Sequence, residues 1–228
     1  MIFTPRARRR GVEYLDEPGV DGATVVRSLA DVARSNALFG GRRAVLGAVA
    51  DALDGVREAT LLDVGTGMGD IPFHARRLAE RRGVRLATVG VELSEPLARA
   101  ARARVGDVVR ADAFALPFAD ASVDVVTCSQ VLHHFADPDA ARLLAELQRV
   151  ARRRVVVGDL RRSWVAAAGF WLASWPLGFH PVTRHDGVVS VLRGFTAAEL
   201  AALARSAGAR APAVRRRLGW RLVASWAP

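Results

Sequence analysis

A glycine-rich stretch at residues 61–70, LLDVGTGMGD, offers the clearest chemistry in this chain. An apolar run of strand character leads into Gly65, Gly67 and Gly69, and a helical pattern begins directly afterwards. A strand that ends in closely spaced glycines exposes free N–H groups at the start of the next helix, where a ligand can approach without meeting a Cβ. We therefore predict a ligand site at this turn, and the alternative is a tight connection that binds nothing.

The spacing of these glycines bears on which ligand fits. They follow the pattern G-x-G-x-G, whereas the dinucleotide fingerprint is G-x-G-x-x-G and needs its third glycine at position 70, where the chain has Asp70. This one-residue difference disfavours a nicotinamide dinucleotide. An NAD-dependent oxidoreductase is therefore the less favoured alternative.

Three acidic residues stand at the ends of three apolar runs. Asp63 lies two residues before the first glycine, Glu92 follows the run 85–91, and Asp112 follows the run 107–111. Open α/β sheets bind ligands outside the carboxyl ends of their strands, so we expect these carboxylates to share one crevice. There they can accept hydrogen bonds from a ribose diol, an amine and an adenine edge.

The elements that must position these residues alternate between strand and helix patterns, which predicts a parallel sheet with right-handed crossovers. The predicted strands cover residues 60–64, 85–91, 107–111, 123–129 and 154–158, and the predicted helices cover 70–82, 94–104 and 137–151. Ser94 is a predicted N-cap, and Thr196 with Glu199 forms a capping-box pattern. Two last strands, 213–217 and 220–225, predict a C-terminal hairpin.

Four segments together resemble the class I methyltransferases that use S-adenosylmethionine (SAM). They are residues 63–69 (DVGTGMG), 91–94 (VELS), 110–113 (RADA) and 122–126 (SVDVV). The resemblance implies an enzyme of the α/β class with SAM as its cofactor and a Rossmann-like, seven-stranded sheet whose last strand is antiparallel. It places the methionine half of SAM near Asp63 and the glycines, the ribose at Glu92 and the adenine at Asp112. The implied cofactor-binding set is Asp63, Gly65, Thr66, Gly67, Gly69, Glu92, Leu93, Asp112, Ala113 and Ser129.

Two helical patterns precede the first strand, one from about Asp21 and one from about Arg42. Such a pair belongs to no parallel strand–helix–strand unit, and in the resembled family an extension of this kind commonly covers cofactor and substrate. We therefore predict an N-terminal helical cap at residues 1–57, followed by a methyltransferase domain at 58–228. Packing of the pair on the flank of the sheet is the alternative.

Histidines are the candidate catalytic bases. Methyl transfer to a hydroxyl requires removal of its proton, and a histidine that titrates near neutral pH can accept it. His133 and His134 follow the fourth predicted strand, and His185 stands next to Asp186. We select His134 and His185 first and His133 third. Only Asp159 is well placed to ligate a metal after the fourth and fifth strands, so no metal is expected.

Residues 163–179 carry no charge and are rich in aromatic side chains, and residues 180–186 are predicted to form a polar loop. The uncharged segment is too short for a bilayer span. We interpret it as an apolar wall for a substrate, with a core helix or a peripheral membrane contact as alternatives. The chain resembles enzymes that methylate quinone precursors in ubiquinone and menaquinone biosynthesis, or polyketides in secondary metabolism. This implies a small apolar, phenolic or quinone-like acceptor, with O-methylation favoured over C-methylation.

The charge balance is strongly basic, with a formal net charge of +10, and all 33 basic residues are arginine. Arginines cluster at residues 8–10, 152–154 and 215–217, but aromatic residues are not interleaved with them. A nucleic-acid substrate is therefore disfavoured, and an RNA methyltransferase is kept as the alternative. The single cysteine, Cys128, excludes an internal disulfide and lies in a predicted strand, where we expect a buried thiol. The first residues lack the apolar core of a signal peptide, so we expect a cytoplasmic protein.

Overall fold

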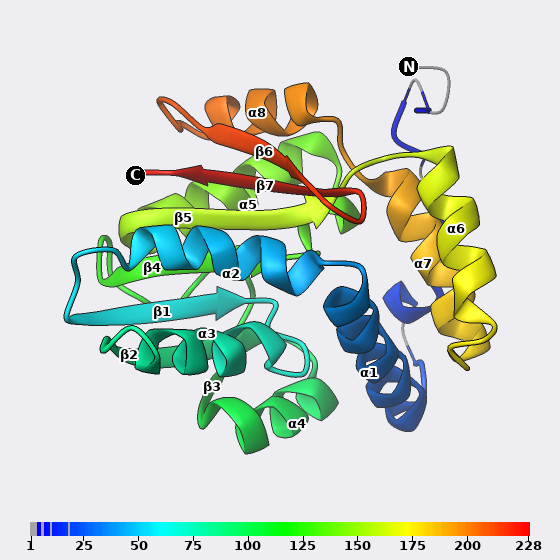
Figure 1. Ribbon diagram of the computed structural model, residues 1–228, viewed down its shortest axis with the longest axis horizontal. Helices are drawn as coiled ribbons and strands as arrows, with labels where there is room; N and C mark the ends of the chain where they lie inside the picture. The colour runs from blue at the N-terminus through cyan, green and yellow to red at the C-terminus, as the bar shows by residue number, and fades with distance from the viewer. Residues whose placement is uncertain (1–3, 6, 10, 18) are drawn as a thin grey trace.

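The computed structural model describes residues 4–5, 7–9, 11–17 and 19–228. Arg10, which belongs to the first predicted arginine cluster, lies outside these residues. The centre of the molecule is a seven-stranded sheet in the order β3-β2-β1-β4-β5-β7-β6 (Figure 1). Its strands are β1 (Glu58–Val64), β2 (Arg85–Glu92), β3 (Asp107–Arg110), β4 (Val123–Ser129), β5 (Ala151–Leu160), β6 (Ala213–Arg217) and β7 (Arg221–Trp226).

The strand directions confirm the predicted fold class. Strands β1 to β5 are parallel, whereas β7 pairs antiparallel with both β5 and β6. β1, β4 and β5 are rich in Val and Leu and mostly buried, as expected of strands covered on both faces. Cys128 is buried in β4, as predicted, and this burial raises the pKa of its thiol. Every predicted strand is present, with ends that differ by at most three residues.

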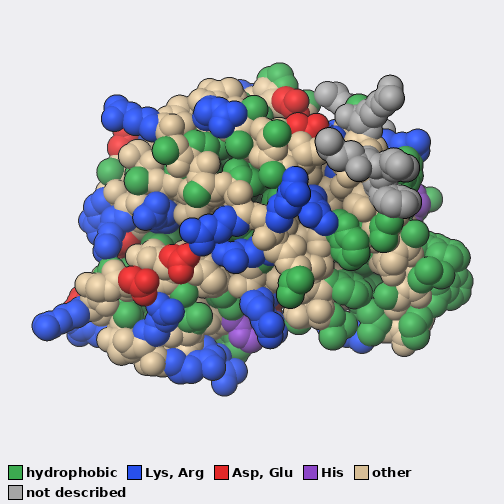
Figure 2. Space-filling view, turned by 45° about the horizontal axis from the view of Figure 1, so that its top comes forward, with side chains coloured by type: hydrophobic (Ala, Val, Ile, Leu, Met, Phe, Trp, Pro, Cys, Tyr) green, Lys and Arg blue, Asp and Glu red, His purple; other side chains and the backbone are tan. Residues whose placement is uncertain are grey.

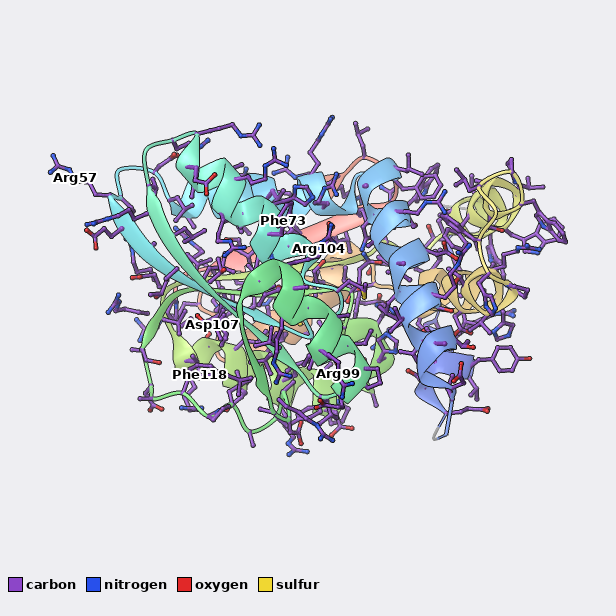
Figure 3. The ribbon with its side chains drawn as sticks, turned by 90° about the horizontal axis from the view of Figure 1, so that it is seen from below. Arg57, Phe73, Arg99, Arg104, Asp107 and Phe118 are labelled. Atoms are coloured by element: carbon purple, nitrogen blue, oxygen red, sulfur yellow. The ribbon has the colours of Figure 1, made fainter. Side chains whose placement is uncertain are left out.

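Helices cover both faces of the sheet. α2 (Gly41–Ala52), α3 (Asp70–Glu80) and α4 (Glu95–Val105) lie on one face, and α5 (Asp137–Val150) and α8 (Ala197–Ser206) lie on the other (Figure 1). α3 and α4 pack together, and the guanidinium carbon of Arg104 lies 5.2 Å from the centre of the Phe73 ring (Figure 3). The predicted capping box of Thr196 and Glu199 opens α8. Ser94 precedes α4, but its side chain makes no capping hydrogen bond, contrary to the prediction.

Three further helices lie beyond the carboxyl ends of the parallel strands: α1 (Gly22–Leu38), α6 (Trp164–Ser174) and α7 (Pro181–Arg193) (Figure 1). Single 3-10 turns occupy Tyr14–Asp16 (η1) and Leu132–His134 (η2). The predicted polar loop at residues 180–186 is wrong, because these residues begin α7. Pro181 occupies the first turn, where its fixed φ suits a helix, and the His180 ring accepts from the Val182 N–H. None of the described helices combines the length and the apolar character that a membrane span needs.

The two N-terminal helices belong to different layers. α1 contacts α4 and α7 at the carboxyl edge of the sheet. α2 instead packs on the sheet itself, where Val49 and Leu53 share a buried cluster with Leu61 of β1 and Val156 of β5. Of the two helices in residues 1–57, α1 thus lies at the carboxyl edge of the sheet and α2 lies on its flank; the division into a cap and a methyltransferase domain stays a prediction. An apolar helical face shows that a helix is covered, but it does not identify the surface that covers it.

Candidate functional site

A cavity of about 1040 Å³ lies at the carboxyl edge of the sheet. Two sets of polar residues meet in it. The first, the glycine-loop end, contains Asp63, residues 65–67, Glu92 and Asp112. The second, the histidine end, contains Glu13, Asp16, His133, His134 and Arg221. Apolar side chains complete the wall, among them Leu29 and Val32 of α1 and Phe170 of α6.

The glycine loop turns sharply at the end of β1. The N–H groups of Gly65 and Thr66 both donate to the Val91 carbonyl at 2.9 Å, which fixes the loop against β2. Gly65 and Gly67 have φ angles of +68° and +54°, a region that strains any residue with a side chain. A Cβ on Gly67 would have only Leu29 within ordinary contact distance, at 3.7 Å. Gly67 therefore leaves bare backbone facing open space in the cavity wall.

Asp63 is buried under this loop, and both of its carboxylate oxygens are engaged. One accepts from the Thr66 hydroxyl at 2.8 Å and the other from the Thr127 hydroxyl at 2.6 Å. Burial raises the pKa of Asp63 to about 6, although the two hydroxyl donors act to lower it. The geometry indicates that Asp63 anchors the loop to β4.

Glu92 and Asp112 are held at the cavity by backbone donors. The Glu92 carboxylate accepts from the Gly67 N–H at 2.9 Å through one oxygen and from the Ser94 N–H at 3.0 Å through the other. Asp112 accepts from the Phe114 N–H at 2.9 Å through Oδ1. A carboxylate oxygen can accept more than one hydrogen bond. Both side chains are therefore oriented and can still accept from a ligand.

The structure brings together the cofactor-binding residues predicted above, because all of them except Gly69 line the cavity. Gly69 is the N-cap of α3, and a Cβ there would come within 2.5 Å of a methyl group of Val105. This packing alone requires glycine at position 69, so no ligand contact is needed to explain the residue. Leu93, which is 62% exposed, lies with Ala113 and Ser129 among the lining residues.

His133 is deeply buried at the histidine end, with 3% of its surface exposed. Its Nδ1 lies 2.7 Å from Oδ1 of Asp159. Burial alone would raise the pKa of Asp159, but the charge and hydrogen bond of His133 outweigh it and lower that pKa. Asp159 is therefore ionised and accepts from Nδ1–H of His133, so Nε2 is the ring nitrogen that does not contact Asp159. Among the described residues, this buried Nε2 has no hydrogen-bond partner.

His134 has a different environment. Its Nδ1 lies 2.9 Å from Oδ1 of Asp16 in η1. Burial alone would lower the pKa of His134, but the hydrogen bond to Asp16 and the charges of Glu13 and Asp16 outweigh it and raise that pKa. The charged form of His134 is thus favoured, and it holds the N-terminal segment in place. A ring that keeps its proton is a poor general base near neutral pH.

Glu13 completes the histidine end. Its carboxylate accepts from Arg193 Nη1 and from the Ser190 hydroxyl, both at 2.9 Å, and lies 4.0 Å from Nε2 of His133. Glu13, His133 and His134 each offer a possible metal-ligand atom, and these atoms lie within 4.8 Å of one another. The sequence did not predict this group. Because Arg193 already supplies a positive charge to Glu13, an ion-pair network accounts for the arrangement.

Arg221 is a buried cation at the same end. The residue is 6% exposed, and among the described residues its Nε has no hydrogen-bond partner. Its Nη1 donates to the Gly219 carbonyl at a long 3.4 Å. Burial lowers the pKa of Arg221 to about 10, against the opposing effect of the Asp159 charge. Free donors on a buried cation suit an electron-rich oxygen of a ligand.

His185, one of the two preferred base candidates, does not line the cavity. Its Nδ1 lies 2.8 Å from Asp186, as the adjacency suggested, but its side chain is 45% exposed and its ring packs against Tyr14. Asp186 instead accepts from the N–H groups of Tyr14 and Leu15. The placement therefore does not support His185 as a base at this site.

Sequence reasoning missed Glu13, Arg193 and Arg221, and it considered Asp159 only as a possible metal ligand. These residues come from parts of the chain that no local motif connects. One signal was available, because Asp159 lies near the end of a predicted strand next to the one that leads to His133. Neighbouring parallel strands bring such positions together at one edge.

Comparison with known proteins agrees with this geometry. A family model described as a methyltransferase domain matches residues 62–157. A demethylmenaquinone methyltransferase from Thermotoga maritima is 31% identical over 129 residues, which cover 53% of this chain and 54% of the relative. Nocamycin O-methyltransferase from Saccharothrix syringae is 30% identical over 190 residues, or 70% of this chain and 66% of the relative. This chain spans about half the length of the first two curated relatives it matches.

The fold comparison points the same way. The crystal structure of a SAM-dependent methyltransferase from Aquifex aeolicus superposes with a TM-score of 0.60 at 19% identity, covering 91% of this chain and 98% of the other. The chain belongs to the class I SAM-dependent methyltransferase family.

Proposed function

We propose that this protein transfers the methyl group of SAM to an oxygen of a small apolar acceptor that is phenolic or quinone-like. The proposal rests on one cavity that joins the glycine-loop end to the buried Nε2 of His133, which has no hydrogen-bond partner among the described residues. Two of the relatives, a demethylmenaquinone methyltransferase and nocamycin O-methyltransferase, are consistent with such an acceptor.

The glycine-loop end fits SAM. Bare backbone at Gly67 would face the methionine half, and the oriented carboxylate of Glu92 would accept from the ribose hydroxyls. Asp112 and Ala113 would border the adenine, with Leu93 against its face and Ser129 near the sulfonium side. Asp63 would act indirectly, by holding the loop through Thr66. SAM supplies an activated methyl group, so the protein has mainly to orient the partners and exclude water.

The histidine end would prepare the acceptor. Asp159 accepts from Nδ1–H and so fixes the His133 ring, and in the neutral form of this ring Nε2 would take the proton of the acceptor hydroxyl. Arg221 would stabilise the oxygen as negative charge develops on it. The apolar residues between the two ends, such as Leu29 and Phe170, would hold the ring of the acceptor.

Mass spectrometry of reactions supplied with SAM and a panel of phenols and quinols tests the proposal. We expect a product heavier by one methyl group for at least one acceptor, with the methyl attached to oxygen in its NMR spectrum. The matched control is His185→Asn, which changes a histidine outside the cavity and should retain activity. A methyl group on carbon, or methylation of RNA and of no small molecule, would contradict the proposal.

A further inference from the structure

The outer face of α6 carries the largest apolar side chains of that helix. Trp171, Leu172 and Trp175 are 48%, 62% and 55% exposed. Trp164 and Val165 lie on the same face, about two to three helical turns earlier, and are 40% and 43% exposed. Positions 164, 168, 171, 172 and 175 follow helical spacing, so these side chains form one continuous stripe.

The inner face of α6 carries one large apolar side chain, Phe170, which lines the cavity, and otherwise smaller groups. Ala167 and Ser174 are its buried residues, and the Ser174 hydroxyl donates to the Trp171 carbonyl. A helix that only packs on a core shows the opposite distribution, with large apolar groups inside. Figure 2 shows hydrophobic side chains gathered at the end of the molecule formed by α6 and α7, with arginines spread over the sheet region. A continuous exposed apolar patch of this kind marks an interaction surface.

Arginines flank both ends of the stripe. The guanidinium carbon of Arg9 lies 4.6 Å from the centre of the Trp164 ring, and that of Arg184 lies 4.0 Å from the Trp175 ring. Residues 163–179 contain no charged side chain. In the part of the chain that the structure describes, no carboxylate lies within 4.0 Å of the Arg9 or Arg184 guanidinium. Tryptophans with arginines beside them suit the boundary between acyl chains and phosphate groups.

We propose that the outer face of α6 docks on the surface of an anionic phospholipid bilayer, with the helix lying in the plane of the membrane. The positive charge at both ends of the stripe argues against a second copy as the occupant. An antiparallel pair of α6 helices would bring Arg9 of one copy close to Arg184 of the other. A phosphate surface instead offers opposite charge to both arginines.

Docking there would also place the cavity next to the membrane. Phe170 comes from α6 and lines the cavity, while Trp171 and Leu172, the next residues, point outward. The helix is thus a wall shared by the cavity and the docked face. An apolar acceptor dissolved in the bilayer would meet the protein at this wall. This consequence rests on the proposed function, but the docking of α6 on a membrane does not.

Cosedimentation with phospholipid vesicles tests the proposal. We expect the protein to bind vesicles that contain phosphatidylglycerol, to bind pure phosphatidylcholine less, and to show a blue-shifted tryptophan emission when bound. Leu172→Glu should weaken partitioning by about tenfold or more, because it places a charge at the centre of the apolar stripe. Leu218→Glu is the matched control, since Leu218 is 85% exposed in the β6–β7 turn, and it should bind like the wild type.

Three results would overturn docking on lipid. Wild-type protein could stay in the supernatant with both kinds of vesicle. Leu172→Glu and Leu218→Glu could weaken binding equally, which would show that α6 is not the docking face. The wild type could form a dimer that Leu172→Glu dissociates, without binding vesicles, which would assign the stripe to a second copy. Calorimetric SAM binding by Leu172→Glu, expected to equal that of the wild type, separates failure of docking from failure of the proposed function.

Discussion

The two ends of the cavity differ in how the chain builds them. At the glycine-loop end, residues 63–67 and the tips of β2 and β3 supply every group, and the main fixed contacts are backbone N–H groups on carboxylates. At the histidine end, the groups come from distant segments and are fixed by side-chain charge pairs, such as Arg193 with Glu13 and His133 with Asp159. Local backbone geometry therefore creates the first end, and only the complete fold creates the second.

This difference has a chemical counterpart. Neutral donors orient Glu92, so its orientation does not depend on the protonation of a partner. At the other end, His134 pairs with Asp16 and His133 pairs with Asp159, so the contacts there depend on the protonation of histidine rings. We expect the backbone contacts of Glu92 to be insensitive to pH, whereas the histidine end and the buried Asp63 should respond to it.

The largest expected effect concerns the histidine end. His133→Asn removes the proposed base, so kcat should fall by about 10²- to 10⁴-fold while the affinity for SAM stays unchanged. Single-turnover mass spectrometry with calorimetry separates the two quantities. A loss of SAM affinity in His133→Asn as large as its loss of kcat would contradict the separation of the two ends. Loss of turnover in His134→Asn but not in His133→Asn would contradict the choice of base.

A pH-dependent effect of similar size concerns Asp63. Its pKa is raised to about 6 in the folded protein from the ordinary 3.8, so the folded state binds the extra proton and stability is lost as pH rises between these values. On going from pH 4 to pH 8, the free energy of unfolding of Asp63→Asn should therefore improve relative to the wild type by about 2 kcal/mol. Urea unfolding at both pH values measures it. An unchanged difference between the two proteins would show that Asp63 has an ordinary pKa.

A smaller effect distinguishes backbone strain from ligand contact in the glycine loop. Gly67 and Gly83 both have positive φ, at +54° and +69°, and neither would place a Cβ in close contact. Gly67→Ala and Gly83→Ala should therefore each lower stability by about 1 kcal/mol. Only Gly67→Ala should weaken SAM binding, by about tenfold to 100-fold in a calorimetric titration. Equal SAM affinity in the two variants would remove Gly67 from the binding surface.

The smallest expected effect is a trade between stability and activity at Arg221. Arg221→Met replaces a buried cation with an apolar side chain of similar length, so the free energy of unfolding should rise by about 1–2 kcal/mol. The KM for the acceptor should rise as well, because the oxygen loses its donor. Thermal unfolding and steady-state kinetics measure the two quantities. A loss of stability would show that Arg221 is a structural residue of β7.

The contrast between the two ends also explains which parts of the fold and of the site could be predicted from the sequence. The strand β4 and the glycine loop were predicted closely because both depend on residues that are adjacent in the chain. The start of α7 was missed because its helix signal consists of Pro181 and a capping His180 within a polar segment. His133 ranked below His185 because Asp186 is adjacent in sequence to His185, whereas Asp159 reaches His133 through the pairing of β4 with β5.

We infer that a nucleoside sulfonium binds at the carboxyl edge of the sheet, with its ribose on Glu92. Isothermal titration of the protein with SAM, and separately with NADH, measures this binding. We expect one saturable site for SAM, weakened by about 1.4 kcal/mol or more in Glu92→Ala, and no heat of binding for NADH. Binding of NADH without SAM, or SAM binding that Glu92→Ala leaves unchanged, would contradict it.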